Sequence, residues 1–222
     1  MWCKDFDIFQ VWRTGENFSL QQRLKATEDL NLQVRMMGKK LSEMTLEELW
    51  QLFPIYLTEH QLCWQEWYSE EEYLLKNTFS STERISHIGS TAISSIWAKP
   101  IIDILVEIPE GRNLLDYKAL IINSGYICMS QSENRLSFNK GYTENGFAER
   151  VFHLHLRYVG DNDELYFRDY LIEYPEVAKE YEELKLRLWK KYEHNRDAYT
   201  NAKTEFVKGY TEKAKILYWN RY

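Results

Sequence analysis

Apolar and polar residues alternate with a period of two through the middle of the chain, which is the pattern of half-buried β-strands. Two long runs of this kind, 100–108 and 147–158, predict the main strands of a sheet. Three shorter β-rich runs, at 84–88, 126–129 and 136–139, predict further strands. The middle of the chain therefore has the content of a β-sheet.

The segments on either side repeat their apolar residues every three to four positions, which is typical of amphipathic helices. Thr45 and Glu48 form a capping box at the start of one helix, and Pro54 ends it. Trp64 and Trp67 belong to the next helix, where we expect core packing; a stacking site for a nucleotide base is the alternative. The predicted helices cover residues 46–53, 63–76, a short stretch from Gly89 to about Trp97, 114–122, 165–173, 175–192 and about 200–220.

This order of elements predicts an α+β fold, with a mixed sheet flanked by helices and a helical C-terminal lobe. Residues 1–35 show weak periodicity, and we expect residues 1–40 to form an N-terminal extension that is either a mobile arm or a docking helix. Residues 41–222 are expected to form one domain, because 222 residues and 26.8 kDa suffice for a single well-filled core.

The composition is that of a globular protein, with 44% hydrophobic and 28% charged residues. No apolar run approaches the roughly 20 residues that a membrane-spanning helix requires. Lys4, Asp5 and Asp7 interrupt any signal-peptide pattern. The three cysteines are scattered and form no CxxC, which argues against a disulfide frame or a cysteine zinc site. We therefore expect a cytoplasmic protein without a membrane partner; the sequence leaves the oligomeric state open.

Charge is distributed unevenly along the chain. The net charge of −6 does not indicate a nucleic-acid partner. The stretch from Lys185 to Tyr222, however, contains ten Lys/Arg and four Asp/Glu, a net charge of +6. A basic segment facing an acidic body could hold an anionic ligand between them; a solvated helix surface packed on an acidic face is the alternative.

Several short motifs occur in order from the middle of the chain onward. They are His87-Ile-Gly-Ser-Thr-Ala92, Ala98-Lys-Pro-Ile-Ile-Asp-Ile104, His153-Leu-His155, Phe167-Arg-Asp-Tyr-Leu171, Pro175-Glu-Val-Ala178, Tyr199 and Ala202-Lys203. In these motifs the chain resembles the GrpB family, which is placed in the nucleotidyltransferase superfamily. The resemblance runs from about Trp64 to the C-terminus, so the GrpB-like part lies within residues 41–222. It implies a nucleotidyltransferase-like fold.

The resemblance also implies a site. In the superfamily a Gly-Ser pair opens a helix beneath the phosphates, and acids on the next strand hold a divalent metal. Gly89, Ser90 and Thr91 match the first feature, and Asp103 matches the first acid. Free N–H groups and the positive end of a helix attract phosphate, and metal-bound carboxylates align the attacking and leaving oxygens. Magnesium or manganese is the implied cofactor.

Leu105 departs from this pattern, because the superfamily usually has a second acid two residues after the first, on the same face of the strand. Glu107 shares that face, but at ~3.3 Å per residue its Cα lies roughly 13 Å from that of Asp103. The two carboxylates are therefore too far apart to coordinate the same ion. A second ligand has to come from another strand.

Glu149, His153 and His155 lie on one face of the predicted 147–158 strand and are the candidates for that ligand. The two histidines are about 7 Å apart at Cα, close enough to converge on one metal or phosphate. Imidazoles suit manganese or zinc better than magnesium. They could equally donate to phosphate without a metal, or form a hydrogen-bonded strand face without a ligand.

Three cations complete the predicted site. Lys99 enters a strand before Pro100, where it could reach a phosphate, and Arg168 begins a helix that the resemblance directs toward the cleft. Lys203 is included on the resemblance alone. Pairing of Asp103 with Lys99 or Arg168 is the structural alternative to a ligand role.

These residues support the hypothesis of a protein that binds a nucleotide or a phosphorylated small molecule, extended to metal-dependent nucleotidyl transfer to a small acceptor. Asp103, His153 and His155 would then be the catalytic and metal-binding residues. The alternative is a non-catalytic binding or interaction module on a degenerate transferase fold, which Leu105 favours. A zinc hydrolase is a third option, without an HExxH motif to support it.

Overall fold

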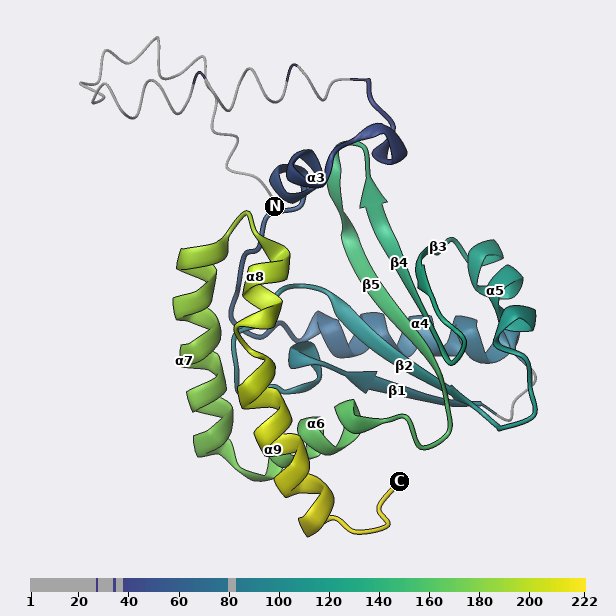
Figure 1. Ribbon diagram of the computed structural model, residues 1–222, viewed down its shortest axis with the longest axis vertical. Helices are drawn as coiled ribbons and strands as arrows, with labels where there is room; N and C mark the ends of the chain where they lie inside the picture. Colours follow the sequence, from purple (N-terminus) through teal and green to yellow (C-terminus); the bar gives the residue numbers. More distant parts are fainter. Residues whose placement is uncertain (1–26, 28–33, 35–37, 80–82) are drawn as a thin grey trace. The chain divides into compact units, whose positions relative to one another are not determined.

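The computed structural model describes residues 27, 34, 38–79 and 83–222 (Figure 1). The chain divides into two compact units, Met1–Leu49 and Trp50–Tyr222. The predicted N-terminal extension lies mostly outside the described residues, and its boundary at residue 40 stays a prediction.

The described part of the first unit contains the 3-10 turn η1 (Leu41–Glu43) and the start of helix α3 (Leu46–Leu52). The predicted capping box is present. The Thr45 N–H donates to Glu48 Oε2 at 2.9 Å, and the Glu48 N–H donates to Thr45 Oγ1 at 3.2 Å. These two bonds satisfy backbone donors that the first turn of a helix otherwise leaves open.

The second unit is built on a five-stranded sheet in the order β1-β2-β5-β4-β3. The central pair β2–β5 is parallel and the other pairs are antiparallel, so the sheet is mixed. The strands span Arg84–Ile88 (β1), Ile102–Ile108 (β2), Ile127–Gln131 (β3), Arg135–Thr143 (β4) and Gly146–Tyr158 (β5).

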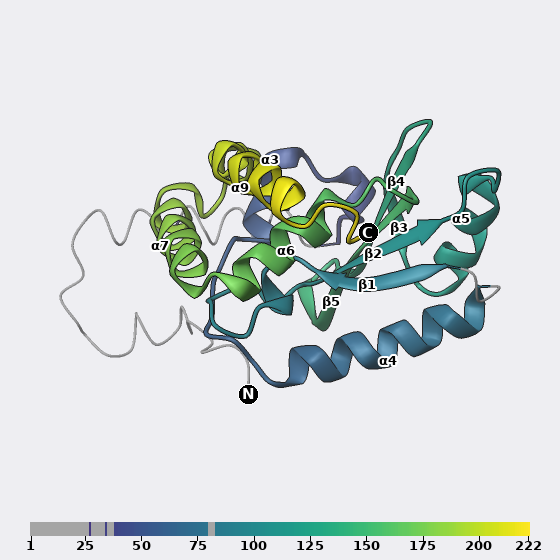
Figure 2. The same cartoon turned by 90° about the horizontal axis from the view of Figure 1, so that it is seen from below.

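Helices cover both faces of this sheet. Figure 2 shows α4 on one side and α6 and α9 on the other, which confirms the predicted α+β architecture with flanking helices and a helical C-terminal lobe. No helix in the described part of the chain is long and apolar enough to cross a membrane. The helices span Cys63–Thr78 (α4), Leu114–Asn123 (α5), Asp163–Glu173 (α6), Pro175–Tyr192 (α7), Arg196–Asn201 (α8) and Thr204–Leu217 (α9).

The two faces of β2 have different surroundings. Ile102, Ile104, Val106 and Ile108 pack in the main core with residues of α4 and α5. On the opposite face Leu105 packs with Ile88 and Leu165 in a smaller cluster. Since the odd-numbered face of β2 also carries Asp103, the lobe formed by α6 to α9 covers the face that the sequence assigns to the site.

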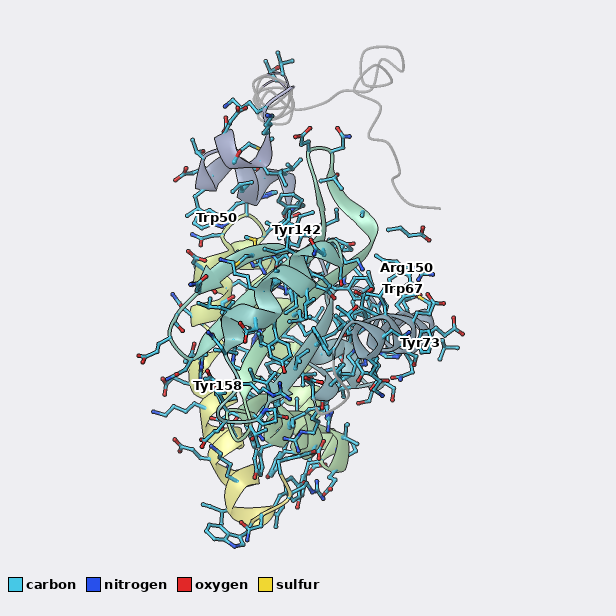
Figure 3. The ribbon with its side chains drawn as sticks, turned by 90° about the vertical axis from the view of Figure 1, so that its right-hand side faces the viewer. Trp50, Trp67, Tyr73, Tyr142, Arg150 and Tyr158 are labelled. Atoms are coloured by element: carbon cyan, nitrogen blue, oxygen red, sulfur yellow. The ribbon has the colours of Figure 1, made fainter. Side chains whose placement is uncertain are left out.

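The tryptophans of α4 belong to the core. Trp64 is 1% exposed and Trp67 is 9% exposed. The guanidinium of Arg150, from β5, lies 5.5 Å from the centre of the Trp67 ring (Figure 3). These indoles are therefore covered by the protein in a way that suits packing rather than base stacking.

Two predicted helices differ in the structure. The segment after Gly89 forms only a 3-10 turn, η2 (Ser90–Ala92), because Ile93 and Ile96 are buried in the C-terminal lobe. The predicted last helix corresponds to α9, which begins only at Thr204, and a separate short helix, α8, precedes it. Ala202 and Lys203 lie between the two helices, and the position of Lys203 at the N-cap of α9 matters for the site.

Candidate functional site

The parallel pairing of β2 and β5 places Asp103 directly opposite His153, and Leu105 opposite His155. Asp103 Oδ1 lies 3.1 Å from His153 Nδ1 and 3.9 Å from His155 Nε2. The predicted convergence of one aspartate and two imidazoles is therefore present. The two rings line different spaces beside the Asp103 carboxylate: His153 lines a small cavity and His155 lines a larger groove.

The hydrogen bonds of His153 define its tautomer. Its Nε2 lies 2.8 Å from the Tyr142 hydroxyl and 3.4 Å from Arg196 Nη2. An arginine only donates, so Nε2 accepts and the ring proton is on Nδ1, from which it is donated to Asp103. Burial lowers the pKa of His153, which keeps this ring neutral.

Asp103 is ionised in this arrangement. Burial, the largest single effect, raises its pKa, but the hydrogen bond from His153 and the nearby ring of His155 outweigh it and hold the pKa well below the ordinary value. The carboxylate therefore places one negative charge at the junction of the cavity and the groove, where it is hydrogen-bonded to His153 at 3.1 Å and has the His155 ring 3.9 Å away.

Position 89 requires glycine because its backbone closely approaches the Asp103 carboxylate. Its φ is +71°, and a Cβ built at this position would lie 2.4 Å from Asp103 Oδ2. Glycine is the residue that tolerates both the left-handed backbone and the contact. The Gly-Ser bend thus packs against the aspartate, as the motif suggested.

The predicted helix beneath the phosphates is wrong in one respect. Ser90 and Thr91 begin a three-residue 3-10 turn, which lacks the dipole of a longer helix. The Thr91 hydroxyl donates to the Ile101 carbonyl at 3.1 Å, while Ser90 Oγ accepts from Lys185 Nζ at 3.1 Å. Positive charge at this position comes from side chains instead of a helix end.

A cavity of about 210 Å³ lies above the bend. Four cationic side chains line it, namely Lys99, Lys185, Arg196 and Lys203, and Asp103 is its one acidic residue. Among the residues that the structure describes, none of the four cations forms an ion pair with a carboxylate. The cavity therefore holds an excess of cationic side chains, of which Lys185 is buried and the other three are half-buried.

The three lysines titrate near neutrality. Burial, together with neighbouring positive charge, lowers the pKa of Lys99 to about 7, that of Lys185 to about 7 and that of Lys203 to about 8. Lys185 is only 2% exposed, and its ammonium also donates to the Trp97 carbonyl. An anion in the cavity would favour the charged form of all three side chains.

Two tyrosines form the aromatic part of the lining. Two ammonium groups lie near the Tyr199 ring, Lys203 Nζ at 4.4 Å and Lys99 Nζ at 5.5 Å from its centre. The Tyr181 ring lies 4.9 Å from Lys185 Nζ. These cation–π contacts partly offset the positive charge of the lysines, and Lys185 has in addition its hydrogen bonds to Ser90 and Trp97.

A groove of about 800 Å³ adjoins the cavity. His155 and Arg168 line it, and Arg168 also donates to the His87 carbonyl at 2.8 Å and pairs with Asp169 at 2.7 Å. The cavity and groove share lining residues, which are Gly89, Ser90, Asp103, Tyr181, Thr200 and Lys203.

The predicted residues are thus divided between two connected spaces. Glu149 is an exception, because it is exposed and lines neither of them. Sequence reasoning missed Lys185, Arg196 and the two tyrosines. The net charge of +6 beyond residue 184 signalled a basic element near an anion, without showing which side chains face the sheet. The cavity contains the predicted Gly89, Ser90, Thr91, Lys99, Asp103, His153 and Lys203, and the groove adds His155 and Arg168.

The donor set does not fit a metal pair. Leu105 is fully buried in hydrocarbon, and Glu107 is paired with Arg84 at 2.5 Å and with Asn162 at 2.9 Å. Both ring nitrogens of His153 already have partners. Within residues 38–79 and 83–222 no group of three His, Cys, Asp or Glu could hold a metal ion. Magnesium prefers an octahedron of oxygens, and the described lining of the cavity offers it the single carboxylate of Asp103.

Comparison with known proteins finds relatives that are GrpB proteins. "Glutamate-rich protein GrpB" of Alkalihalophilus pseudofirmus is 36% identical over 161 residues, which cover 69% of this chain and 91% of that protein. The crystal structure of conserved protein GrpB from Enterococcus faecalis superposes with a TM-score of 0.64 at 30% identity, over 74% of this chain and all of that one.

A more distant similarity is to the Cid1 poly(U) polymerase with bound MgGTP, at 12% identity and a TM-score of 0.40, over 66% of this chain and 46% of that one. These values are too low to support a conclusion about activity. The family model described as GrpB protein matches residues 54–213, which contain the whole cavity and nearly all of the groove. The chain belongs to the GrpB family.

Proposed function

We propose that this protein binds a nucleotide or another phosphorylated small molecule, with the phosphates in the cavity. The observation that carries the proposal is the set of four cations without a carboxylate partner. Buried charges are unfavourable unless they are paired, and here Lys99, Lys185 and Lys203 lie together with Arg196 around a space of about 210 Å³. A phosphate group supplies the missing negative charge and several acceptor oxygens.

Binding without a metal pair is the better-supported form of this function. Transfer by two metals requires at least two carboxylates that bridge the ions, and Leu105 occupies the position of the second. Asp103 is also held by two imidazoles. Nucleotidyl transfer to a small acceptor is therefore the second candidate, supported by the family motifs and by the position of Asp103 beside the phosphates.

Isothermal titration calorimetry tests the binding proposal. ATP, GTP, CTP, UTP and inorganic triphosphate are titrated in EDTA and again with magnesium or manganese. We expect binding in EDTA, because the chain supplies the positive charges itself. Lys185→Ala should weaken it by roughly tenfold or more, the value of one charge-assisted hydrogen bond. Lys190→Ala, an exposed lysine of the same helix, is the matched control. Absence of heat with every one of these anions would overturn the proposal.

Asp103→Asn separates the two candidates. If the cations bind phosphate directly, removal of the opposing negative charge leaves the affinity for triphosphate in EDTA unchanged or higher. If Asp103 holds a metal that bridges to the phosphates, the same substitution abolishes the gain in affinity that magnesium or manganese provides. A gain with metal in the wild type that Asp103→Asn removes would favour nucleotidyl transfer.

A further inference from the structure

The groove beside the cavity differs from it in chemistry. Where the cavity is lined by cations, the inner wall of the groove is formed by Ile88, Ile93, Phe167 and Val207. Ile88 and Ile93 are buried, whereas Phe167 of α6 and Val207 of α9 are only partly covered. The charged residues of α6 and α9 that line the groove, among them Glu164 and Lys208, are of both signs, so the groove has no excess charge comparable with that of the cavity.

The two spaces are continuous at the residues that define the site. Asp103, Tyr181 and Lys203 line both of them, and so does the Gly89-Ser90 bend. A molecule whose phosphates contact Lys203 from within the cavity can therefore extend into the groove past the same side chain. The groove is nearly four times as large as the cavity, with about 800 Å³ against about 210 Å³.

We propose that the ligand has two chemically distinct parts, a phosphate or diphosphate end in the cavity and an uncharged, largely apolar organic body in the groove between α6 and α9. This inference rests on the proposed function and deepens it, because it names the class of ligand. Removal of apolar surface from water against Phe167 and Val207 then adds to the affinity that the cations provide. An inorganic phosphate, which lacks the organic body, should therefore bind less tightly than the organic phosphate.

The covalent link between the two parts would lie beside Asp103 and His155. His155 Nε2 lies 3.9 Å from Asp103 Oδ1 on the groove side of the carboxylate. This arrangement places hydrogen-bonding groups at the boundary between the charged and the apolar part. It suits the ester oxygen or first hydroxyl of an organic phosphate better than a continuous hydrocarbon chain.

The test compares each organic phosphate with its inorganic counterpart by calorimetry in EDTA. ATP is compared with inorganic triphosphate, and geranyl diphosphate with inorganic diphosphate. At least one organic probe should bind tenfold or more tightly than its counterpart. The two arms distinguish a nucleoside body from an aliphatic one.

A variant then locates the organic body. Thr204 is an exposed residue of α9 that lines the groove, and Thr204→Trp should fill it. We expect this variant to reduce the tenfold preference to threefold or less while the affinity for the inorganic anion stays within twofold. Glu205→Trp, exposed on the same turn and lining neither space, should leave both affinities unchanged.

The possible failures are distinguishable. If the inorganic anions bind and neither organic probe binds more tightly, or if Thr204→Trp leaves the preference intact, the two-part ligand is wrong and the anion site stands. If none of the inorganic anions binds and neither organic probe binds, the proposed function fails as well. Thermal unfolding of both tryptophan variants shows that any loss of binding occurs in a folded protein.

Discussion

Asp103 and His153 face each other across the one parallel strand pair of the sheet, with Asp103 Oδ1 3.1 Å from His153 Nδ1. The register of β2 and β5 creates this contact, and the Tyr142 hydroxyl and Arg196 fix the opposite nitrogen of the ring. The aspartate is thereby held as an anion inside a space lined with cations. The predictions below follow from that balance of charge.

Anion binding should strengthen as the pH falls. The pKa values of about 7 for Lys99 and Lys185 and about 8 for Lys203 are lowered from that of a free lysine, so these groups gain protons between about pH 9 and about pH 6. Sulfate is a suitable probe because its own charge does not change in this range. Its affinity, measured at constant ionic strength, should rise at least tenfold from about pH 9 to about pH 6. In Lys203→Arg the dependence should become shallower, since arginine stays charged; a flat profile in the wild type would contradict the assignment.

Lys99→Met should stabilise the free protein and weaken anion binding. A charged Lys99 close to Arg196 and Lys203 is unfavourable without an anion. The unfolded chain retains the proton of this lysine up to about pH 10, so the wild type regains stability as the pH rises above about 7. We expect the free energy of unfolding of Lys99→Met to exceed that of the wild type by about 1 kcal/mol at about pH 6 and by less at about pH 9. Urea unfolding at both pH values measures this, and a destabilised variant at about pH 6 would argue against it.

Gly89→Ala should destabilise the protein more than Gly111→Ala. Both glycines have positive φ, +71° and +91°, but a Cβ added at Gly89 would meet atoms of Asp103, whereas one added at Gly111 would meet nothing within 4 Å. The backbone strain of about 1 kcal/mol is common to both variants. We expect a further loss of about 1 to 2 kcal/mol at Gly89, together with a changed affinity for sulfate. Equal losses in urea unfolding would show that the approach to Asp103 is not restrictive.

Acid should destabilise the protein through His87. Burial lowers the pKa of this residue to about 4; its ring stacks on Tyr68, Nε2 lies 3.0 Å from Thr91 Oγ1, and Nδ1 has no hydrogen-bond partner among the described residues. Between about pH 6.5 and about pH 4 the unfolded chain therefore binds a proton that the folded chain does not. Stability present above that range is lost as the pH falls through it, by on the order of 3 kcal/mol in all.

The slope of unfolding free energy against pH checks this contribution. In His87→Gln the slope between about pH 6.5 and about pH 4.5 should be shallower by up to about 1.4 kcal/mol per pH unit. His194→Gln removes an exposed histidine and should leave the slope unchanged. Parallel slopes for all three proteins would assign the acid lability to other groups.

Local patterns in the sequence predicted the strands and most helices, because alternation and helical spacing report which side chains are buried. The alternation within β5 also showed that His153 and His155 share a face. The contact of that face with Asp103 depends on the order and register of strands that are 50 residues apart in sequence. The family resemblance supplied the role of Asp103, and the absence of a second acid suggested the histidines as its neighbours, but spacing could not predict the register that brings them together.

The cations of the C-terminal lobe could not be assigned to the site from sequence periodicity. Lys185 lies on an amphipathic helix, where a lysine normally faces solvent, yet it is among the most buried side chains of the protein. Lys203 lies at the N-cap of α9, between that helix and α8, and it lines the site. In both cases tertiary packing of the lobe against the sheet overrides the local preference; the excess of positive charge hinted at Lys185, and the family resemblance indicated Lys203.

The burial of Leu105 with Ile88 and Leu165 limits how this protein can change during evolution. A carboxylate at position 105 would restore the two-acid motif, but it would have to replace hydrocarbon in a part of the structure that supports β1, β2 and α6. A single substitution would therefore lose folding stability before it could provide a second metal ligand. A carboxylate pair on this strand would therefore require replacement of Leu105 together with the apolar residues that pack against it.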